Sequence, residues 1–204
     1  MVLHPRDIRA KFGADYVATE HTFRLGIDTR LTTHFAGRFI GRKVLETCTG
    51  GGFTTIALAR VAAYVVTVEI EPAHQVQARR NVEKAGVLER VTFVAGDVLG
   101  EGVLDSCPPF DAGFLDPDWA VSGPEHIFRF RNSNMRPPAD VLLRRVLSRI
   151  RDVALILPPL VDASEFEGLP PHEREMLFLG GSHELSCLYF GELARTNGLT
   201  EWRP

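Results

Sequence analysis

Hydrophobic and polar positions follow a regular rhythm along most of this 204-residue chain. Short β-branched or apolar runs predict strands, and longer stretches with apolar residues three or four positions apart predict helices between them. The predicted strands are residues 43–48, 64–70, 90–97, 110–116 and 152–159, and the predicted helices are residues 54–63, 71–86 and 139–150. Strands that alternate with helices predict a mostly parallel sheet with helices on both faces, and so an α/β fold.

The N-terminal region, residues 1–42, departs from this rhythm because it is polar and shows no clear period. It predicts a short helical extension of one or two helices. One helix is expected to begin near Thr32 or Thr33, since threonine is a competent N-cap, and to end at Gly41.

The C-terminal region departs from the rhythm in a different way. Two strand-like runs lie on either side of Gly180 and Gly181, and this pattern predicts a β-hairpin. No interdomain linker is visible between the first strand and the end of the chain. Residues 43–204 are therefore expected to form one domain whose parallel sheet ends in an antiparallel hairpin.

The composition is that of a globular protein. Hydrophobic residues make up 45% of the chain and charged residues 24%, enough apolar material for a substantial core. No apolar run is long enough for a transmembrane helix, and the N-terminus shows no apolar signal region. The three cysteines and seven histidines lie scattered without metal-ligand spacing. We therefore expect no metal, no membrane partner and a reducing cytoplasmic location.

Charge is distributed unevenly. The chain has a net charge of -3, yet residues 126–151 contain seven arginines and a single acid, Asp140. Such a basic segment on an acidic protein favours phosphate binding, and so an RNA partner. The alternative is a solvated helix face whose arginines pair outward.

A glycine-rich turn follows the first predicted strand in "VLETCTGGGF". Glu46 closes the strand, and Gly50 and Gly52 follow it. Glycines at this position let the backbone turn sharply and approach a ligand closely. The next helix begins with free N–H groups that suit an anion. A tight strand-to-helix turn with no ligand is the alternative for this motif alone.

Two further acids end the second and third predicted strands. Glu69 lies about 20 residues beyond the glycine turn, where an acid is placed to accept hydrogen bonds from both hydroxyls of a ribose. Glu71 competes for that role but occupies a helix-cap position. Asp97 is placed to meet an adenine amino group. Each acid alone could be a surface carboxylate, but ligands of such sheets bind beyond the carboxyl ends of the strands.

The fourth predicted strand runs into "DPDW", residues 116–119. This stretch resembles the (D/N/S)-P-P-(Y/F/W) motif of methyltransferases that act on exocyclic amino groups of bases or on other planar nitrogens, and the resemblance implies the following roles. An exocyclic amine of a nucleobase is a poor nucleophile, so its N–H groups must be held by acceptors while a ring fixes the base plane. Asp116 and the Pro117 carbonyl would accept from the amine, and Trp119 would stack on the base. The alternative for Trp119 is a core or interface aromatic.

Together these motifs resemble the class I S-adenosylmethionine-dependent methyltransferases. The longer stretches "VLETCTGGGFTTIALA", "VVTVEIEP", "FVAGDV", "GFLDPDWAVSGPEH" and "EREMLFLGGSHELSCLYFGEL" resemble the trimethylguanosine synthase family, the RNA cap guanine-N2 methyltransferases, and its prokaryotic relatives. The resemblance covers residues 43–194 and implies a Rossmann-like sheet of seven strands that ends in the antiparallel hairpin. It also implies transfer of a methyl group from S-adenosylmethionine, with S-adenosylhomocysteine as product and no metal.

The resemblance assigns roles residue by residue. The implied cofactor residues are Glu46, Thr49, Gly50, Gly52, Thr54, Thr55, Glu69, Ile70, Asp97, Val98 and Asp116. The implied catalytic residues are Asp116, Pro117 and Trp119, and the implied substrate residues are Asp118, Trp119, Phe128, Arg129 and Arg131.

Two departures separate the chain from that family. Asp118 stands where the family keeps a second proline, and the link from Trp119 to Pro124 is two residues longer. The N-terminal region, which helps to bind the methylated cap in the family, matches only vaguely. We therefore predict guanine N2 of a structured RNA rather than a cap as the acceptor. A small-molecule N-methyltransferase and a non-catalytic cofactor- or RNA-binding module are the alternatives.

Overall fold

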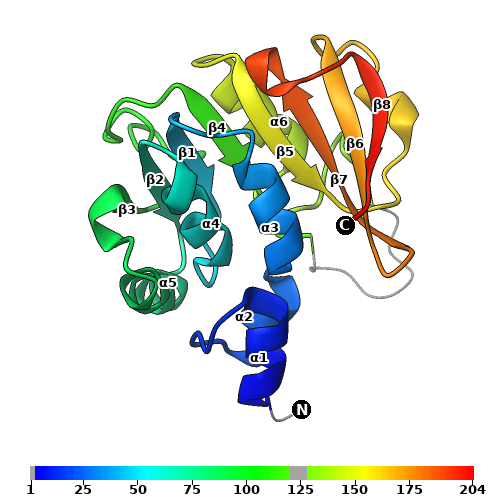
Figure 1. Ribbon diagram of the computed structural model, residues 1–204. Helices are drawn as coiled ribbons and strands as arrows, with labels where there is room; N and C mark the ends of the chain where they lie inside the picture. The colour runs from blue at the N-terminus through cyan, green and yellow to red at the C-terminus, as the bar shows by residue number, and fades with distance from the viewer. Residues whose placement is uncertain (1–2, 120–127) are drawn as a thin grey trace. The chain divides into compact units, whose positions relative to one another are not determined.

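The computed structural model describes residues 3–119 and 128–204. The chain divides into two compact units, Met1–Phe110 and Asp111–Pro204, and each is described by itself. Figure 1 shows the order of the elements from the N-terminus in blue to the C-terminus in red. No helix within the described ranges is long and apolar enough to cross a membrane.

The first unit is a three-stranded parallel sheet with helices before and between its strands. Its strand order is β3-β2-β1, and β2 runs parallel to both of its neighbours. Its elements are α1 (Pro5–Phe12), α2 (Glu20–Leu25), α3 (Thr29–Ala36), β1 (Lys43–Thr47), α4 (Phe53–Val61), β2 (Tyr64–Glu69), α5 (Pro72–Lys84), the 3₁₀ helix η1 (Leu88–Arg90) and β3 (Val91–Ala95).

The N-terminal region contains three helices, so the prediction of one or two was wrong. The last, α3, begins at Thr29 and ends at Ala36, not near Thr32 and Gly41. Asp28 is its N-cap, because the Asp28 carboxylate accepts a hydrogen bond from the Arg30 N–H at 2.9 Å. Thr32 lies inside the helix, where its hydroxyl donates back to the Thr29 carbonyl.

The N-terminal helices share a hydrophobic core with the rest of the first unit. The rings of Phe12 in α1 and Phe53 in α4 are stacked with their centroids 3.6 Å apart. Ile8, Tyr16, Ile56 and Val82 complete the same buried cluster. The boundary between an extension and a domain at residue 43 stays a prediction, and the compact unit includes both sides of it.

The second unit is a five-stranded mixed sheet. Its strand order is β4-β5-β7-β6-β8; β4 runs parallel to β5, β7 runs antiparallel to β5 and β6, and β8 runs parallel to β6. Its elements are β4 (Ala112–Leu115), α6 (Ala139–Leu147), β5 (Asp152–Leu157), η2 (Ala163–Phe166), β6 (His172–Leu179), β7 (Ser182–Phe190), η3 (Gly191–Leu193) and β8 (Gly198–Trp202).

The predicted hairpin is confirmed as β6 and β7 around Gly180 and Gly181. Both glycines have positive φ angles, 57° and 88°, which a two-residue hairpin turn requires. The edge strand β8 was not predicted, because "GLTEW" is short and mostly exposed and its pattern is weak. The structure describes eight strands where seven were expected. The α/β, Rossmann-like class is confirmed.

Candidate functional site

The turn between β1 and α4 is the centre of a cluster of chemically active groups in the first unit. We call Glu46, Gly50, Gly52, Thr55 and Glu69 the glycine-loop cluster. Gly50 and Gly52 have φ angles of 52° and 78°, in the left-handed region. A Cβ on Gly52 would lie 2.9 Å from the Cβ of Ala78, so only glycine lets α5 pack this closely against the turn.

Gly50 differs from Gly52 because its side-chain direction is open. The nearest atom to a Cβ built there is the Cys48 carbonyl oxygen at 3.9 Å. Its backbone N–H donates to Oε2 of Glu69 at 2.8 Å, which joins the turn to the end of β2. The turn therefore has a bare backbone face next to an acidic side chain.

Glu69 is the best-connected acid of the cluster. Its Oε1 accepts from the Glu71 N–H at 2.9 Å, and His74 Nδ1 lies 3.8 Å from the same oxygen. Burial acts to raise the pKa of Glu69, but the nearby His74 ring and the hydrogen bonds from the Glu71 and Gly50 N–H groups together lower it below its usual range. The carboxylate is ionised at neutral pH, and each oxygen keeps a lone pair for a further donor.

Glu46 differs from Glu69 because its pKa is raised and not lowered. Its side chain is 2% exposed at the end of β1, and the Thr55 hydroxyl donates to its Oε2 at 2.6 Å. Burial raises the pKa of Glu46 to about 7, because hydrogen bonds from Thr55 and Thr67 offset the loss of solvation only in part. The cluster thus pairs one carboxylate that is ionised with one that titrates near neutrality.

The remaining residues that were predicted to bind the cofactor differ in their exposure to solvent. Thr49 and Thr54 are buried, and the Thr49 hydroxyl shares a hydrogen bond with the Thr67 hydroxyl. Val98 is buried, whereas Ile70 is 67% exposed. Asp97 is exposed, and its Oδ1 accepts from the Leu99 N–H at 2.9 Å, so it caps its own turn.

Two polar residues of α5 were missed by the sequence reasoning. Asn81 is fully buried, and its Nδ2 donates to the Gly51 carbonyl at 2.9 Å and to the Val17 carbonyl at 2.8 Å. Gln77, one turn earlier, also donates to the Val17 carbonyl. These hydrogen bonds therefore fix the glycine turn and the N-terminal segment against α5. Two amides four residues apart on one helix face were the available signal.

The segment after β4 forms a second group, in the second unit. We call Asp116, Pro117, Asp118 and Trp119 the acidic loop. Asp118 forms an isolated antiparallel bridge with Arg136: the Asp118 N–H donates to the Arg136 carbonyl at 2.8 Å, and the Arg136 N–H donates back at 2.9 Å. An ion pair of 3.1 Å joins their side chains.

This bridge explains why the chain has no second proline in the loop. A proline at position 118 would lack the N–H that donates to Arg136. The rigidity that a proline would supply through its fixed φ angle comes here from two backbone hydrogen bonds. The next residue, Trp119, lies edge-on to Phe128, with centroids 5.8 Å apart and planes at 89°.

Arg131, Arg136 and Arg144 of the predicted basic segment make contacts within the second unit. The Arg131 guanidinium donates to the carbonyls of Glu165 and Glu167, and Arg144 pairs with Asp140. Arg129 is exposed. His126 and Ile127 of the segment lie outside the described residues. The structure therefore brings Phe128 to Trp119, and it places Arg131 against carbonyl groups of its own unit.

Solved structures identify the class of this fold. A protein of Porphyromonas gingivalis, described as a putative methyltransferase, superposes with a TM-score of 0.74 at 16% identity, over 91% of this chain and 47% of that one. The TrmK protein of M. capricolum, solved with S-adenosyl-homocysteine, superposes with a TM-score of 0.55 at 12% identity, over 82% of this chain and 69% of that one. The fold is that of the class I methyltransferases.

The sequence itself matches a family. Residues 41–166, more than half of the chain, match the family described as RNA cap guanine-N2 methyltransferase. The chain belongs to this family. It is also 45% identical over 86 residues to a catechol O-methyltransferase of Mycobacterium tuberculosis, a match that covers 41% of this chain and 39% of that protein. The chain thus matches well under half the length of that relative.

Proposed function

We propose that the protein transfers a methyl group from S-adenosylmethionine to an exocyclic amino nitrogen of a nucleobase, guanine N2 in RNA. The observation that carries the proposal is the acidic loop. It puts an aspartate, a proline carbonyl and an aromatic ring directly after a buried strand, in a chain that belongs to a guanine-N2 methyltransferase family. The alternatives keep the same fold. In one the methyl acceptor is a small molecule, and in the other no methyl group is transferred.

The glycine-loop cluster fits a nucleoside cofactor. Glu69 is ionised and retains acceptor capacity on both oxygens, which suits the two hydroxyls of a ribose. The open side of Gly50 leaves a bare backbone for close approach. When bound there, S-adenosylmethionine would supply an electrophilic methyl group on a sulfonium. Glu69 and the Gly50 backbone would hold it, and Glu46 would set the charge near the methionine end.

The acidic loop would orient the acceptor. Asp116 and the Pro117 carbonyl would accept hydrogen bonds from the amine N–H groups, so that the nitrogen lone pair is directed to the methyl group. Trp119 would stack on the base, an interaction worth about 1–3 kcal/mol. The Asp118–Arg136 bridge would hold these groups in place, and stacking, hydrogen bonding and positioning would together make the amine reactive.

A labelling experiment tests the acceptor. The protein is incubated with radiolabelled S-adenosylmethionine and total RNA, DNA or a metabolite extract, and the RNA is digested to nucleosides. We expect label in N2-methylguanosine, with Trp119→Phe retaining more transfer than Trp119→Ala. Label in another nucleoside, or in DNA alone, would reject the guanine assignment.

The catechol O-methyltransferase relative supports a second candidate, methylation of a small molecule. The same experiment includes catechol and a pool of small aromatic amines as acceptors. Transfer to these at rates above those for RNA would favour this candidate. A salt titration adds a second criterion, because phosphate contacts make RNA affinity fall steeply with salt whereas small neutral acceptors show little dependence.

A non-catalytic role is the third candidate. It predicts that the protein binds S-adenosylmethionine but transfers no methyl group to RNA, DNA or metabolites.

We also propose that the protein works in a reducing cytoplasm. None of the three cysteines, Cys48, Cys107 and Cys187, forms a disulfide, which supports this proposal.

A further inference from the structure

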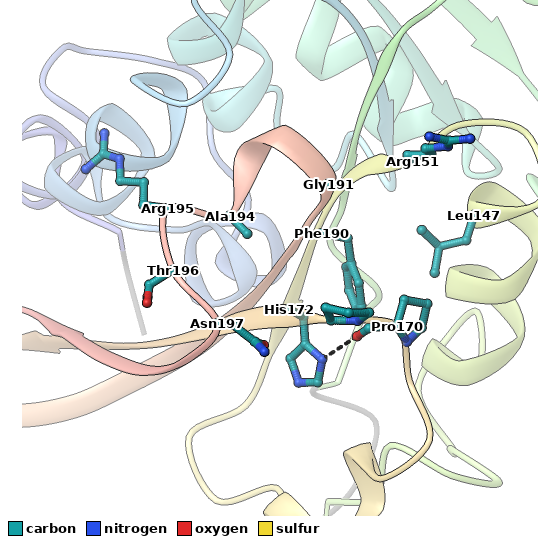
Figure 2. Close-up of a pocket in the computed structure, with 11 residues that line it drawn as sticks. Leu147, Arg151, Pro170, His172, Phe190, Gly191, Ala194, Arg195, Thr196 and Asn197 are labelled. Atoms are coloured by element: carbon teal, nitrogen blue, oxygen red, sulfur yellow. Dashed lines mark hydrogen bonds between the residues drawn. The ribbon is translucent and has the colours of Figure 1, made fainter.

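A cavity in the second unit belongs to neither group described above. It has a volume of about 550 Å³, and Figure 2 shows the residues around it. The residues that matter for its chemistry are Arg151, Pro170, His172, Phe190, Arg195 and Asn197. A volume of this size is in the range of small-ligand pockets, about 300–1,000 Å³.

The cavity lies at the opposite end of the sheet from the acidic loop. β4 and β5 run parallel, and Ala112 and Leu115 pair with Asp152 and Leu155. The acidic loop follows the carboxyl end of β4, whereas Arg151 comes just before the amino end of β5. These ends are separated by a strand length of about 10 Å. A group bound in the cavity is therefore separate from the base that the acidic loop would hold.

The floor of the cavity is apolar and aromatic. The rings of His172 and Phe190 lie with centroids 5.3 Å apart at an angle of 39°, beside Pro170. His172 Nδ1 is 2.8 Å from the Pro170 carbonyl oxygen. A carbonyl only accepts, so Nδ1 donates this hydrogen bond. Phe190 is 1% exposed and supports the floor from beneath, so the surface open to a ligand is that of His172 and Pro170. Nε2 of His172 is the ring nitrogen left to bond a base or a ribose hydroxyl.

The rim is cationic. In Figure 2, Arg195 and Arg151 lie on either side of the group formed by Phe190, Pro170 and His172, with their guanidinium groups directed outward. Within the described part of the chain, neither guanidinium has a hydrogen bond or ion pair. A guanidinium that turns toward the cavity would offer a bidentate donor to a phosphate bound at this rim.

The loop that carries Arg195 and Asn197 is held in place by Glu173 of β6. Glu173 is 1% exposed, and its Oε2 accepts from the Arg195 N–H at 2.7 Å while its Oε1 accepts from the Thr200 hydroxyl at 2.9 Å. A second acid, Asp152, accepts from the Glu192 N–H. These carboxylates are occupied by donors of their own unit, so they hold the rim and leave the arginines for a ligand.

We propose that this cavity binds a nucleotide, with its base against His172 and Pro170 and its phosphate on Arg195 or Arg151. The inference rests on the proposed RNA substrate, since an RNA strand held at its acceptor guanine would present further nucleotides to such a site. The same chemistry would also accept a free mononucleotide.

The test compares Arg195→Gln and Arg151→Gln with Arg203→Gln. Arg203 is an exposed arginine of the same unit that pairs with Glu201, so it is a matched control for the removed charge. Binding of a fluorescent single-stranded RNA of about ten nucleotides and of GMP is measured against salt. We expect affinity to fall about tenfold in one or both rim variants. The salt slope for RNA should become shallower by about 0.7 for each phosphate that the variant no longer neutralises.

The two probes separate the two sources of the nucleotide. An effect on RNA alone assigns the site to the RNA strand, and an effect on GMP as well, with GMP binding as tightly as RNA, assigns it to a free nucleotide. Equal affinities in wild type, the rim variants and the control would overturn the proposal.

A second measurement does not depend on affinity. RNA that contains 4-thiouridine is crosslinked by ultraviolet light, and the attached peptides are identified by mass spectrometry. Crosslinks in the peptides that contain His172 or Phe190 are expected, and their absence from both peptides would count against the cavity. Failure of the proposed function gives a different pattern: crosslinks persist, but no methyl group is transferred to RNA.

Discussion

The glycine-loop cluster and the acidic loop both follow buried strands, yet they are held in different ways. In the first, side chains bind backbone and one another: Glu69 accepts from Gly50, and Glu46 accepts from Thr55. In the second, backbone binds backbone, between Asp118 and Arg136. The first should therefore respond to changes of side-chain charge. The second should respond to loss of a backbone donor or of the ring that the loop presents.

The largest expected effect is on the acidic loop. Trp119→Ala should lower kcat/KM for RNA by about 100-fold, because a base stack worth up to about 3 kcal/mol is removed. Cofactor affinity, measured by calorimetry, should stay unchanged. Trp119→Phe keeps a ring and serves as the control. A Trp119→Ala variant that methylates at the wild-type rate would remove the stacking role.

The next effect concerns pH and the glycine-loop cluster. Burial raises the pKa of Glu46 to about 7 from an ordinary value of 4.5, so the folded state holds this proton more tightly than the unfolded state. The contribution to stability is full below pH 4.5 and is lost as the pH rises through about 7. The free energy of unfolding should fall by roughly 3 kcal/mol across this window.

Urea unfolding of the wild type and of Glu46→Gln at several pH values measures that contribution. Subtracting the two curves cancels other groups, including His183, whose pKa burial lowers. The difference should decline between pH 4.5 and 7 and then stay flat. The lowered pKa of Glu69 acts in the opposite direction and only below its ordinary value. A pH-independent difference would show that folding does not raise the pKa of Glu46.

A somewhat smaller effect is expected from restoring the family proline. Asp118→Pro should lower the free energy of unfolding by about 2 kcal/mol, since it removes the N–H that donates to Arg136 and leaves that carbonyl without its partner. Asp118→Asn keeps the backbone donor and loses only a partly exposed ion pair, so it should cost less than about 1 kcal/mol. Equal stabilities for the two variants would mean that the bridge contributes nothing.

The smallest effect separates the two acids at the end of β2. Glu69→Gln should weaken S-adenosylmethionine binding about tenfold, because a neutral amide replaces a charged acceptor. Glu71→Gln changes an exposed side chain that makes no cap hydrogen bond, and its affinity should match that of the wild type. Calorimetric titration of both variants decides between them. A larger loss of S-adenosylmethionine affinity in Glu71→Gln would assign the contact with the ribose hydroxyls to Glu71 and not to Glu69.

Several elements could be predicted because their signal is local. Pro72 begins α5, and the paired glycines turn the hairpin, since each residue restricts the backbone at its own position. The start of α3 was predicted wrongly because Asp28 and Thr32 are both competent caps, and the sequence does not show which of them lies outside the helix. Strand β8 was missed because its stability comes from pairing with β6 and not from its own pattern.

The candidate site divides in the same manner. The sequence by itself determined the family and the positions of Glu46, Glu69 and the acidic loop, because strand ends and turns follow from local periodicity. Only the tertiary structure decided that Asp118 pairs with Arg136, eighteen residues further on, and that Arg131 binds carbonyls near Glu165. Both contacts join segments that are far apart in the sequence, and such segments meet only when the chain has folded.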